Sequence, residues 1–338
     1  MKKGWQYVQA NGTNEKMAPM TLAENVLMSE DGASLKDVMP SNPNLLINGD
    51  FQVWQRGTSF LHTILGQSVY TADRWVAYYY SGQTIVQTEN TSPIPTKYAL
   101  ANYRTSTAGI CMILQIPENL VQMGGNYYTL SFWARGYGGY SGSYRAVIGG
   151  QYFSFTLSSS WTKYEFTITS PFTYYADERR GVQFYKEGLP SGQGIELSAC
   201  KLEPGYIATP FLPRIYPEEL AMCQRYYENS WFPLTKSCVN EHIAQIWNTG
   251  YADMRINYMV DKRIVPAVTV VPEGSETSVY YYAINGAYYQ AASHSVLGRG
   301  GIKGDVIRFM KSASDTSTWT PGQSIQGRVH WEADSEIY

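Results

Sequence analysis

The sequence predicts a mainly β protein, with an antiparallel jelly-roll sandwich, a second C-terminal β domain, a short N-terminal docking element and one linking helix. Between residues 44 and 214, many short stretches of strand-forming residues are separated by Gly, Pro and Asn, which is typical of antiparallel sandwiches. The chain holds 29 tyrosines and only 16% charged residues, against about 25% in an average domain. Tyrosine-rich sequences favour packed β-sheets, and 338 residues favour two or three domains.

Residues 1–42 are predicted to be an attachment segment and linker. Asp31-Gly32 provides a turn signal, since glycine accepts the positive φ of a hairpin turn. The segments on either side are too short to bury a core, so we expect a small hairpin or short helix that docks the protein on a larger particle. A flexible leader is the alternative. Pro40 and Pro43 prevent a helix from continuing into the next domain.

Residues 43–214 are predicted to form the sandwich, and three stretches in it alternate between two kinds of residue. Because successive side chains of a strand point to opposite faces, each stretch has an inner and an outer row. The inner rows hold Tyr128, Leu130, Phe132, Ala134, Tyr164, Phe166, Ile168, Val182 and Phe184. The outer rows hold Thr129, Ser131, Trp133, Arg135, Glu165, Thr167, Gln183 and Tyr185.

Residues 215–228 are predicted to be the linking helix. Pro217 suits a first helical turn, and the acidic residues after it complement the positive end of the helix dipole. Leu220, Cys223 and Tyr227 recur at i, i+3 and i+7, which predicts one apolar stripe.

Residues 229–338 are predicted to form a C-terminal β tip domain. Asn285-Gly286, between two tyrosine-rich flanks, predicts a two-residue hairpin turn. The glycine-rich stretch 298–304 lacks the Lys-Ser/Thr of a phosphate loop and is expected to connect two strands. The candidate strands cover residues 263–271, 279–289, 306–310 and 325–331.

Charge, hydropathy and cysteine usage argue against several function classes. The formal net charge is −2, which gives no electrostatic footprint for nucleic acid or an anionic membrane. The longest apolar run, Ile264 to Val271, is far shorter than the roughly 20 residues of a membrane helix, and the sequence starts without a signal-peptide core. The cysteines form no C-x-x-C pair, so we expect reduced thiols in a protein folded in a reducing cytoplasm.

Catalytic and metal-binding motifs are missing from the sequence. It contains no H-E-x-x-H, G-x-S-x-G, G-x-x-x-x-G-K-[ST] or G-x-G-x-x-G pattern, and its four histidines are scattered. We therefore expect no catalytic residue, no metal and no cofactor. A glycosidase needs two acids about 5–10 Å apart, and the sequence alone does not give such distances. The acids that could form such a pair are Asp177, Glu178, Glu187 and Glu196.

Several ordered phrases of the chain resemble a known family. They are NLLINGDFQVWQRGTSF (44–60), YTADRW (70–75), YTLSFWARG (128–136), SSWTKYEF (159–166), KLEPG (201–205), ATPFLPR (208–214) and YPEELAMCQRYY (216–227). Together they resemble the jelly-roll, carbohydrate-binding-module-like domain of tail fibre and receptor-binding proteins from phages, prophages and phage-tail-like particles. Related modules often hold a structural calcium near the first strand, but Gln52 stands where many relatives have an acid, which disfavours calcium beside Asp50.

The resemblance implies a phage or phage-tail-like particle receptor-binding protein, a tail fibre that adheres to bacterial cell-surface glycans. It implies a location in the virion tail, a homotrimer, and docking to tail or baseplate proteins through residues 1–42, without membrane insertion. Two alternatives stay open: a structural baseplate or tail component without receptor contact, and a polysaccharide depolymerase.

The predicted ligand-binding surface is the outer, less apolar face of the sandwich. Sugars stack their C–H faces on aromatic rings and need polar partners for their hydroxyls. The residues of this face that could provide these contacts are Trp133, Arg135, Glu165, Gln183 and Tyr185. The alternative is that this face packs against a neighbouring subunit. In the C-terminal domain the candidates are Asn285 and Tyr288, because tyrosine is a large contact residue that loses little rotamer entropy. There the alternative is that the tyrosines pack the interior of a trimer.

Overall fold

The computed structural model describes the sandwich, the linking helix and most of the C-terminal β domain. The described residues are 41–78, 80–94, 96–106, 109–118, 127–169, 181–233, 241–271, 281–298 and 300–336. The predicted attachment segment lies outside them, apart from its last two residues. Within the described residues the chain is mainly β with antiparallel sheets, so the predicted fold class is confirmed.

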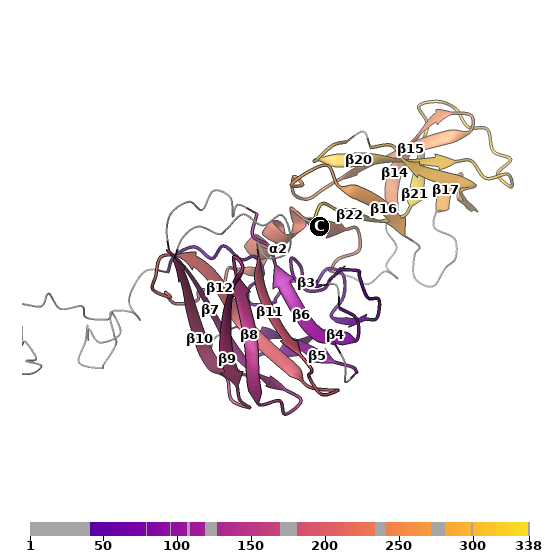
Figure 1. Ribbon diagram of the computed structural model, residues 1–338. Coiled ribbons are helices and arrows are strands. Elements are labelled where there is room, and N and C mark those ends of the chain that lie inside the picture. The colour runs from indigo at the N-terminus through magenta and orange to yellow at the C-terminus, as the bar shows by residue number, and fades with distance from the viewer. Residues whose placement is uncertain are drawn as a thin grey trace, which may run out of the picture.

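Two six-stranded antiparallel sheets form the sandwich (Figure 1). The first sheet has the order β1 (Ser59–His62), β4 (Gln83–Glu89), β5 (Tyr98–Arg104), β12 (Gly194–Pro204), β7 (Tyr127–Tyr137) and β10 (Thr162–Thr169). The second sheet has the order β2 (Val69–Tyr70), β3 (Val76–Ala77), β6 (Ile110–Gln115), β11 (Val182–Glu187), β8 (Gly142–Ile148) and β9 (Gln151–Leu157). From β5 to β12 the chain crosses repeatedly between the two sheets, as in a jelly roll.

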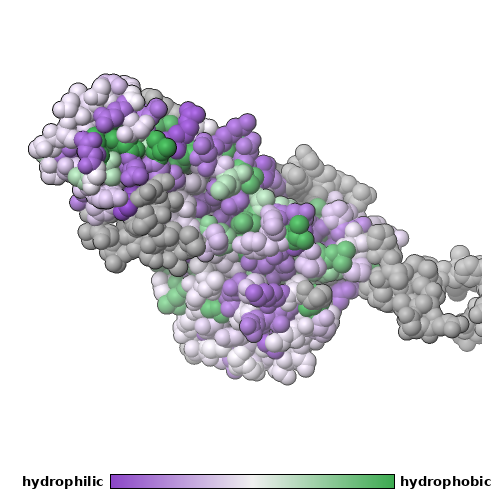
Figure 2. Space-filling view, turned by 180° about the vertical axis from the view of Figure 1, so that it is seen from behind, coloured by the Kyte–Doolittle hydropathy of each residue, from purple (hydrophilic) through white to green (hydrophobic). Residues whose placement is uncertain are grey.

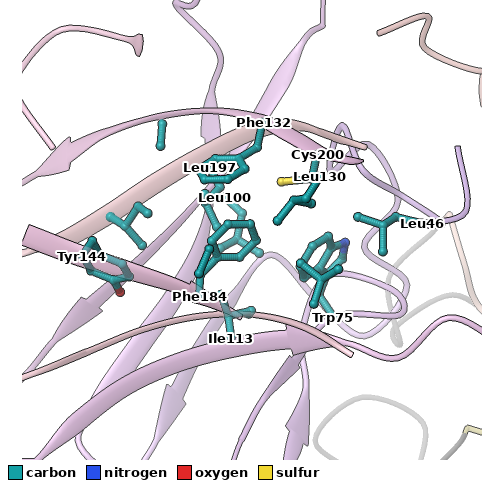
Figure 3. Packing of buried hydrophobic residues seen from close by; sticks show 14 of the residues in the cluster. Leu46, Trp75, Leu100, Ile113, Leu130, Phe132, Tyr144, Phe184, Leu197 and Cys200 are labelled. Atoms are coloured by element: carbon teal, nitrogen blue, oxygen red, sulfur yellow. The ribbon is translucent and has the colours of Figure 1, made fainter. Parts of the chain in front are cut away.

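The core of the sandwich lies between the two sheets. Leu130 and Phe132 of β7 and Phe184 of β11 are fully buried, and the rings of Phe132 and Phe184 meet edge to face with 4.7 Å between their centroids. Figure 3 shows these side chains converging in the space between the sheets. Tyr164 and Phe166 of β10 are partly buried and pack on the same core. The inner rows of all three predicted strands therefore face the core.

The helix α2 (Tyr216–Gln224) connects the sandwich to the C-terminal domain (Figure 1). It begins near Pro217, as predicted, but ends at Gln224 rather than at residue 228. The helix ends earlier than predicted because Tyr227 belongs to a strand that pairs with residues 332–334. The helix is therefore shorter than its sequence pattern predicts.

The apolar stripe predicted for α2 is confirmed only in part, because Cys223 and Tyr227 are buried but Tyr227 lies beyond the helix and Leu220 is not fully buried. The buried residues of the helix are Glu219 and Cys223, whereas Leu220 is only partly buried. Glu219 is buried because it has fixed partners: its carboxylate accepts a hydrogen bond of 3.0 Å from Arg214 and another from the backbone N–H of Asn48. A paired carboxylate thus takes the inward position that the pattern assigned to leucine.

The C-terminal domain consists of a three-stranded and a seven-stranded sheet. The smaller sheet has the order β13 (Tyr227–Asn229), β22 (His330–Asp334) and β16 (Ala267–Val271). The larger has the order β18 (Ala287–Gln290), β17 (Tyr281–Ile284), β21 (Ser324–Arg328), β14 (Glu241–Asn248), β15 (Tyr251–Asn257), β20 (Gly304–Met310) and β19 (Ser293–Val296). The sequence did not predict the hairpin of β14 and β15.

The predicted Asn285-Gly286 hairpin is confirmed, because β17 pairs with β18 and the two turn residues have φ angles of 53° and 81°. Two positive φ values in a two-residue turn define the type I′ hairpin. The larger sheet also exposes apolar side chains, including Ile243, Trp247 and Met310. Figure 2 shows hydrophobic residues gathered on one side of the C-terminal domain, whereas the sandwich in the same view is mostly hydrophilic to neutral.

A buried set of ion pairs, the junction cluster, fastens the end of the chain to the sandwich. Arg74 forms an ion pair with Glu336, and both side chains are only 2% exposed. The Arg74 guanidinium also lies 3.6 Å from the ring centre of Tyr226 and donates to the carbonyl oxygen of Ile116 at 2.8 Å. The cluster is completed by Arg56, Asp73 and Asp334. Because guanidinium groups stack on aromatic rings and pair with carboxylates, the cluster joins the two domains without relying on apolar contact alone.

No helix of the described residues is long and apolar enough to cross a bilayer. Cys111, Cys200 and Cys223 are buried thiols, and burial raises the pKa of Cys111 to about 12. Cys238 lies outside the described residues. The three described thiols are therefore protonated and unreactive near neutral pH.

Candidate functional site

The predicted ligand-binding residues of the sandwich lie on two surfaces, not one. Trp133, Arg135 and Glu165 project from the outer face of the first sheet, whereas Gln183 and Tyr185 project from the outer face of the second. The prediction that all five share one face is wrong in this respect. Alternation within a strand separates inside from outside, but it does not reveal to which of two sheets an outer face belongs.

The outer face of the first sheet carries a hollow of about 360 Å³, here called the β7 groove. It is lined by Thr88, Glu89, Arg135, Gly136, Tyr137, Gly138, Ser159 and Glu196. The strand register creates it: Arg135 of β7 lies opposite Glu196 of β12, which lies opposite Ala101 of β5. Ala101 and Ala99 of β5 are fully buried and do not line the groove, and their small side chains leave room for Thr88 and Glu196 to meet over them.

Arg135 is held in a fixed orientation at the groove. Its Nε donates to Glu196 Oε2 at 2.6 Å, and its guanidinium lies 4.9 Å from the ring centre of Trp161. The other carboxylate oxygen of Glu196 accepts a 2.6 Å hydrogen bond from the hydroxyl of Thr88, across the alanines of β5. Glu196 is buried, whereas Arg135 remains partly exposed. The groove therefore presents an oriented guanidinium group with a partner that fixes it.

Tyr137 lines the β7 groove, and a second tyrosine, Tyr103, packs on it from outside the lining. The rings of Tyr103 and Tyr137 stack with centroids 4.7 Å apart, although a strand lies between them. The intervening residue is Gly194, where a Cβ would come within 2.0 Å of the Asn102 carbonyl oxygen. Burial, Tyr103 and the Glu196 carboxylate raise the pKa of Tyr137, so its hydroxyl stays protonated and can donate a hydrogen bond.

Trp133 and Glu165 lie farther along the same face. Trp133 lines a separate hollow of about 250 Å³ together with Lys163 and Phe211. Glu165 forms an ion pair of 2.7 Å with Lys163, the residue opposite Trp133 in the register of β7 and β10. Both predicted residues therefore lie on the same face as the β7 groove but do not line it.

The residues predicted on the second sheet have different surroundings. Gln183 is buried, so it does not present its amide at the surface. Tyr185 is partly exposed, and its hydroxyl accepts a 3.0 Å hydrogen bond from Arg145. Tyr152 meets Tyr185 edge to face at 6.4 Å. Tyr185 also packs on a cluster of apolar residues on this outer face, Val76, Met112, Leu114 and Ile116.

The third predicted place lies at the β17–β18 turn of the C-terminal domain. Asn285 and Tyr288 line a hollow of about 350 Å³ with Ile243 and Gln326. The Tyr288 hydroxyl accepts a 3.1 Å hydrogen bond from Arg328, whose guanidinium lies 4.3 Å from the ring centre. The structure brings these two predicted residues together, as the hairpin requires.

Sequence reasoning missed most of the groove around Arg135. Glu196 appeared only as a candidate catalytic acid, and Trp161, Tyr137 and Thr88 were not selected. One signal was available in YALANYR (98–104), where small residues occupy alternate positions of a strand and allow side chains of the neighbouring strands to meet over it. The pairing of β12 with β5 and β7 was needed to place Glu196 beside Arg135.

The described residues contain no group of three His, Cys, Asp or Glu side chains arranged to hold a metal ion. Asp50, where a structural calcium was considered, instead accepts a 3.0 Å hydrogen bond from Gln52. Two of the acids considered for a glycosidase, Asp177 and Glu178, lie outside the described residues.

No protein-family model matches the chain, and no curated protein matches it in sequence. Solved structures with similarity to it include the enzymatically active domain of tailspike protein 4 from bacteriophage CBA120 (11% identity, TM-score 0.32), which covers 48% of this chain. This chain spans 21% of that domain.

Two further similar structures are covered almost whole by this chain. The CBM22-1 xylan-binding domain from Paenibacillus barcinonensis has 12% identity and a TM-score of 0.28 over 51% of this chain and 99% of that one. TmCBM61, solved with β-1,4-galactotriose, has 16% identity and a TM-score of 0.28 over 48% of this chain and 99% of that one. At TM-scores this low, the sandwich assignment rests on the strand pairing of this chain itself.

Proposed function

We propose that this protein binds carbohydrate through the β7 groove and serves as the receptor-binding, tail-fibre subunit of a phage or phage-tail-like particle. The observation that carries the proposal is the Arg135 guanidinium, oriented by Glu196 and Trp161 at the edge of an open hollow. A planar guanidinium group donates to two hydroxyls of one sugar ring. The tyrosine hydroxyl, Ser159 and Glu89 add further donors and acceptors along the same groove.

The form of the groove favours a chain-like ligand. Arg135 and Trp133 are successive outward residues of β7, and each lines its own hollow. Two neighbouring hollows on one strand fit consecutive units of a polysaccharide better than a compact metabolite. Aromatic rings beside both hollows, Trp161 and Trp133, provide flat apolar surfaces of the kind on which sugar rings stack.

We propose that binding occurs without catalysis. Both oxygens of Glu196 already accept hydrogen bonds, from Arg135 and from Thr88. A carboxylate in this position orients the arginine and is poorly placed to donate a proton to a glycosidic oxygen. Release of reducing ends from a bound polysaccharide would contradict this part of the proposal.

The proposed assembly is a homotrimer that docks to a tail or baseplate through residues 1–42. Its support is the sequence resemblance and the exposed apolar residues of the C-terminal sheet, such as Ile243 and Trp247. Several copies of a weak glycan site on one particle gain avidity without new contacts. Light scattering of the purified chain should give the mass of three copies, and a monomeric mass at micromolar concentration would contradict it.

Binding to an array of bacterial surface polysaccharides tests the function, with the full chain and two matched variants. Arg135→Lys keeps the charge but removes the planar donor pair, so we expect binding about ten-fold weaker. Arg145→Lys makes the same change on the second sheet and should bind like the wild type. No binding to any polysaccharide would favour the structural tail component, and loss through Arg145→Lys alone would move the site to the second sheet.

A further inference from the structure

Another hollow, of about 550 Å³, lies beside the start of α2 and shares no lining residue with the β7 groove. We call it the α2 cavity. Several distant segments of the chain meet there, and its lining includes Asp50, Trp54, Lys97, Tyr98, Arg214 and Tyr216. Its volume lies within the range of cavities that hold small molecules, roughly 300–1,000 Å³.

Asp50 is the unusual residue of this cavity. Its Oδ2 accepts a 3.0 Å hydrogen bond from Gln52, but its Oδ1 has no hydrogen-bond partner among the described residues, although the side chain is 95% buried. Oδ1 itself is enclosed, but Asp50 is one of the residues that line the cavity. Its carboxylate is therefore an acidic acceptor for a donor from a ligand in this cavity.

The charges around Asp50 restrict the chemistry of that donor. Lys97 and Arg214 line the same cavity, which disfavours a ligand with an ammonium group. Asp50 itself and the nearby Glu219, which acts electrostatically on it, disfavour an anion. The remaining class is a neutral ligand whose donors are hydroxyl groups.

The other walls of the cavity are aromatic. Tyr216 is 41% exposed and Tyr98 is partly exposed. The ammonium group of Lys97 lies 5.0 Å from the ring centre of Tyr98, and a hydrogen bond to that tyrosine raises the pKa of Lys97. Flat rings beside a hydroxyl acceptor form the combination that sugars need, an apolar face and a polar edge.

We propose that the α2 cavity binds one unit of a neutral sugar, with a hydroxyl donated to the Asp50 carboxylate and the ring resting against Tyr216. The site would give the protein a second carbohydrate contact, so the proposal deepens the proposed function, but it depends on residues that the β7 groove does not use.

Saturation-transfer NMR on the full chain, with D-glucose, D-galactose and N-acetyl-D-glucosamine as probes, tests the proposal. At least one of these sugars should bind the wild type. Tyr216→Ala removes the stacking ring and should weaken that binding about ten-fold. Ile215→Ala, an exposed neighbour outside the cavity lining, should bind like the wild type.

Asp50 provides a second readout that does not depend on Tyr216. Its pKa is about 6, raised mainly by burial and also by Glu219, so the carboxylate accepts a sugar hydroxyl most strongly above that pH. Binding by the wild type should strengthen as pH rises through about 6, with the charges of Lys97 and Arg214 unchanged, and Asp50→Asn should remove this dependence.

Arg135→Lys separates this proposal from the proposed function, because it should leave binding of the three sugars unchanged. If Arg135→Lys abolishes binding while Tyr216→Ala does not, the sugars bind in the β7 groove and the α2 cavity proposal is wrong. Absence of binding by all three sugars, with the wild type correctly folded, also contradicts the α2 cavity proposal and leaves polysaccharide binding in the groove to be judged by its own experiment.

Discussion

The junction cluster and the β7 groove are built from the same three kinds of group, an arginine, a carboxylate and an aromatic ring. At the junction, Arg74 lies against Tyr226 and Glu336, and both charged side chains are 2% exposed. In the groove, Arg135 lies against Trp161 and Glu196, and the arginine side chain is 29% exposed. Burial therefore distinguishes a contact that fastens two domains from one that is open to a ligand.

The largest expected effect is on the buried arginine. Arg74→Ala removes the main partner of the buried Glu336, which keeps only a longer 3.4 Å contact with Arg56, and should lower the free energy of unfolding by about 3–5 kcal/mol. The control is Arg225→Ala, since Arg225 forms a more exposed pair with Glu118 at the same junction and should cost less than about 1 kcal/mol. Chemical denaturation measures both, and equal losses would remove the distinction between the two kinds of arginine.

The strand that carries Arg135 allows a second test, because its two faces should differ. Phe132→Ala opens a cavity in the core and should cost about 3–5 kcal/mol. Trp133→Ala, one residue along on the outer face, should cost less than half of that loss, because Trp133 is only partly buried. A loss below about 1 kcal/mol for Phe132→Ala would show that the face assignment of β7 is inverted.

The comparison also indicates what sequence reveals and what it does not. The inner row of β7, with Leu130 and Phe132, follows from alternation within one strand, and the type I′ turn at Asn285 follows from two adjacent residues. The β7 groove depends on residues far apart in sequence, because Arg135 and Glu196 are separated by 61 positions. Only the register of β5, β12 and β7 places them together.

The separation of the two outer faces has the same origin. Trp133 and Tyr185 both alternate with core residues, so their patterns are equivalent in sequence. One lies on the first sheet and the other on the second because β7 and β11 pair with different neighbours. The burial of Glu219 in α2 could not be predicted from the sequence either, since only the folded chain brings it together with its partners, Arg214 and the backbone of Asn48.

Asp50 combines features of both regions: it is buried like Asp73 and Glu336 of the junction cluster, but no ion pair of the described residues includes it. Its folded-state pKa of about 6, against an ordinary 3.8, means that ionisation opposes folding. The stability it contributes is present below about pH 4 and is lost as pH rises through 6, a change of up to about 3 kcal/mol. The Tm of Asp50→Asn minus that of the wild type should increase from pH 4 to pH 7, and a difference independent of pH would contradict this.

The smallest effect on stability is expected in the groove. Arg135→Lys keeps a cation beside Glu196 in a partly exposed pair, so the free energy of unfolding should change by less than about 1 kcal/mol. Thermal denaturation of this variant therefore serves as the control for its binding assay. A loss as large as that of Arg74→Ala would mean that Arg135 holds the fold together instead of serving a ligand.

The most direct measurement is a crystal structure of the protein with a bound oligosaccharide from a polysaccharide selected on the array. We predict sugar density in the β7 groove, with hydroxyls within hydrogen-bond distance of the Arg135 guanidinium and a sugar ring against Trp161. Density over Tyr185 and Tyr152 on the second sheet, or only at the Asn285 turn, would contradict the central claim that the first sheet carries the ligand.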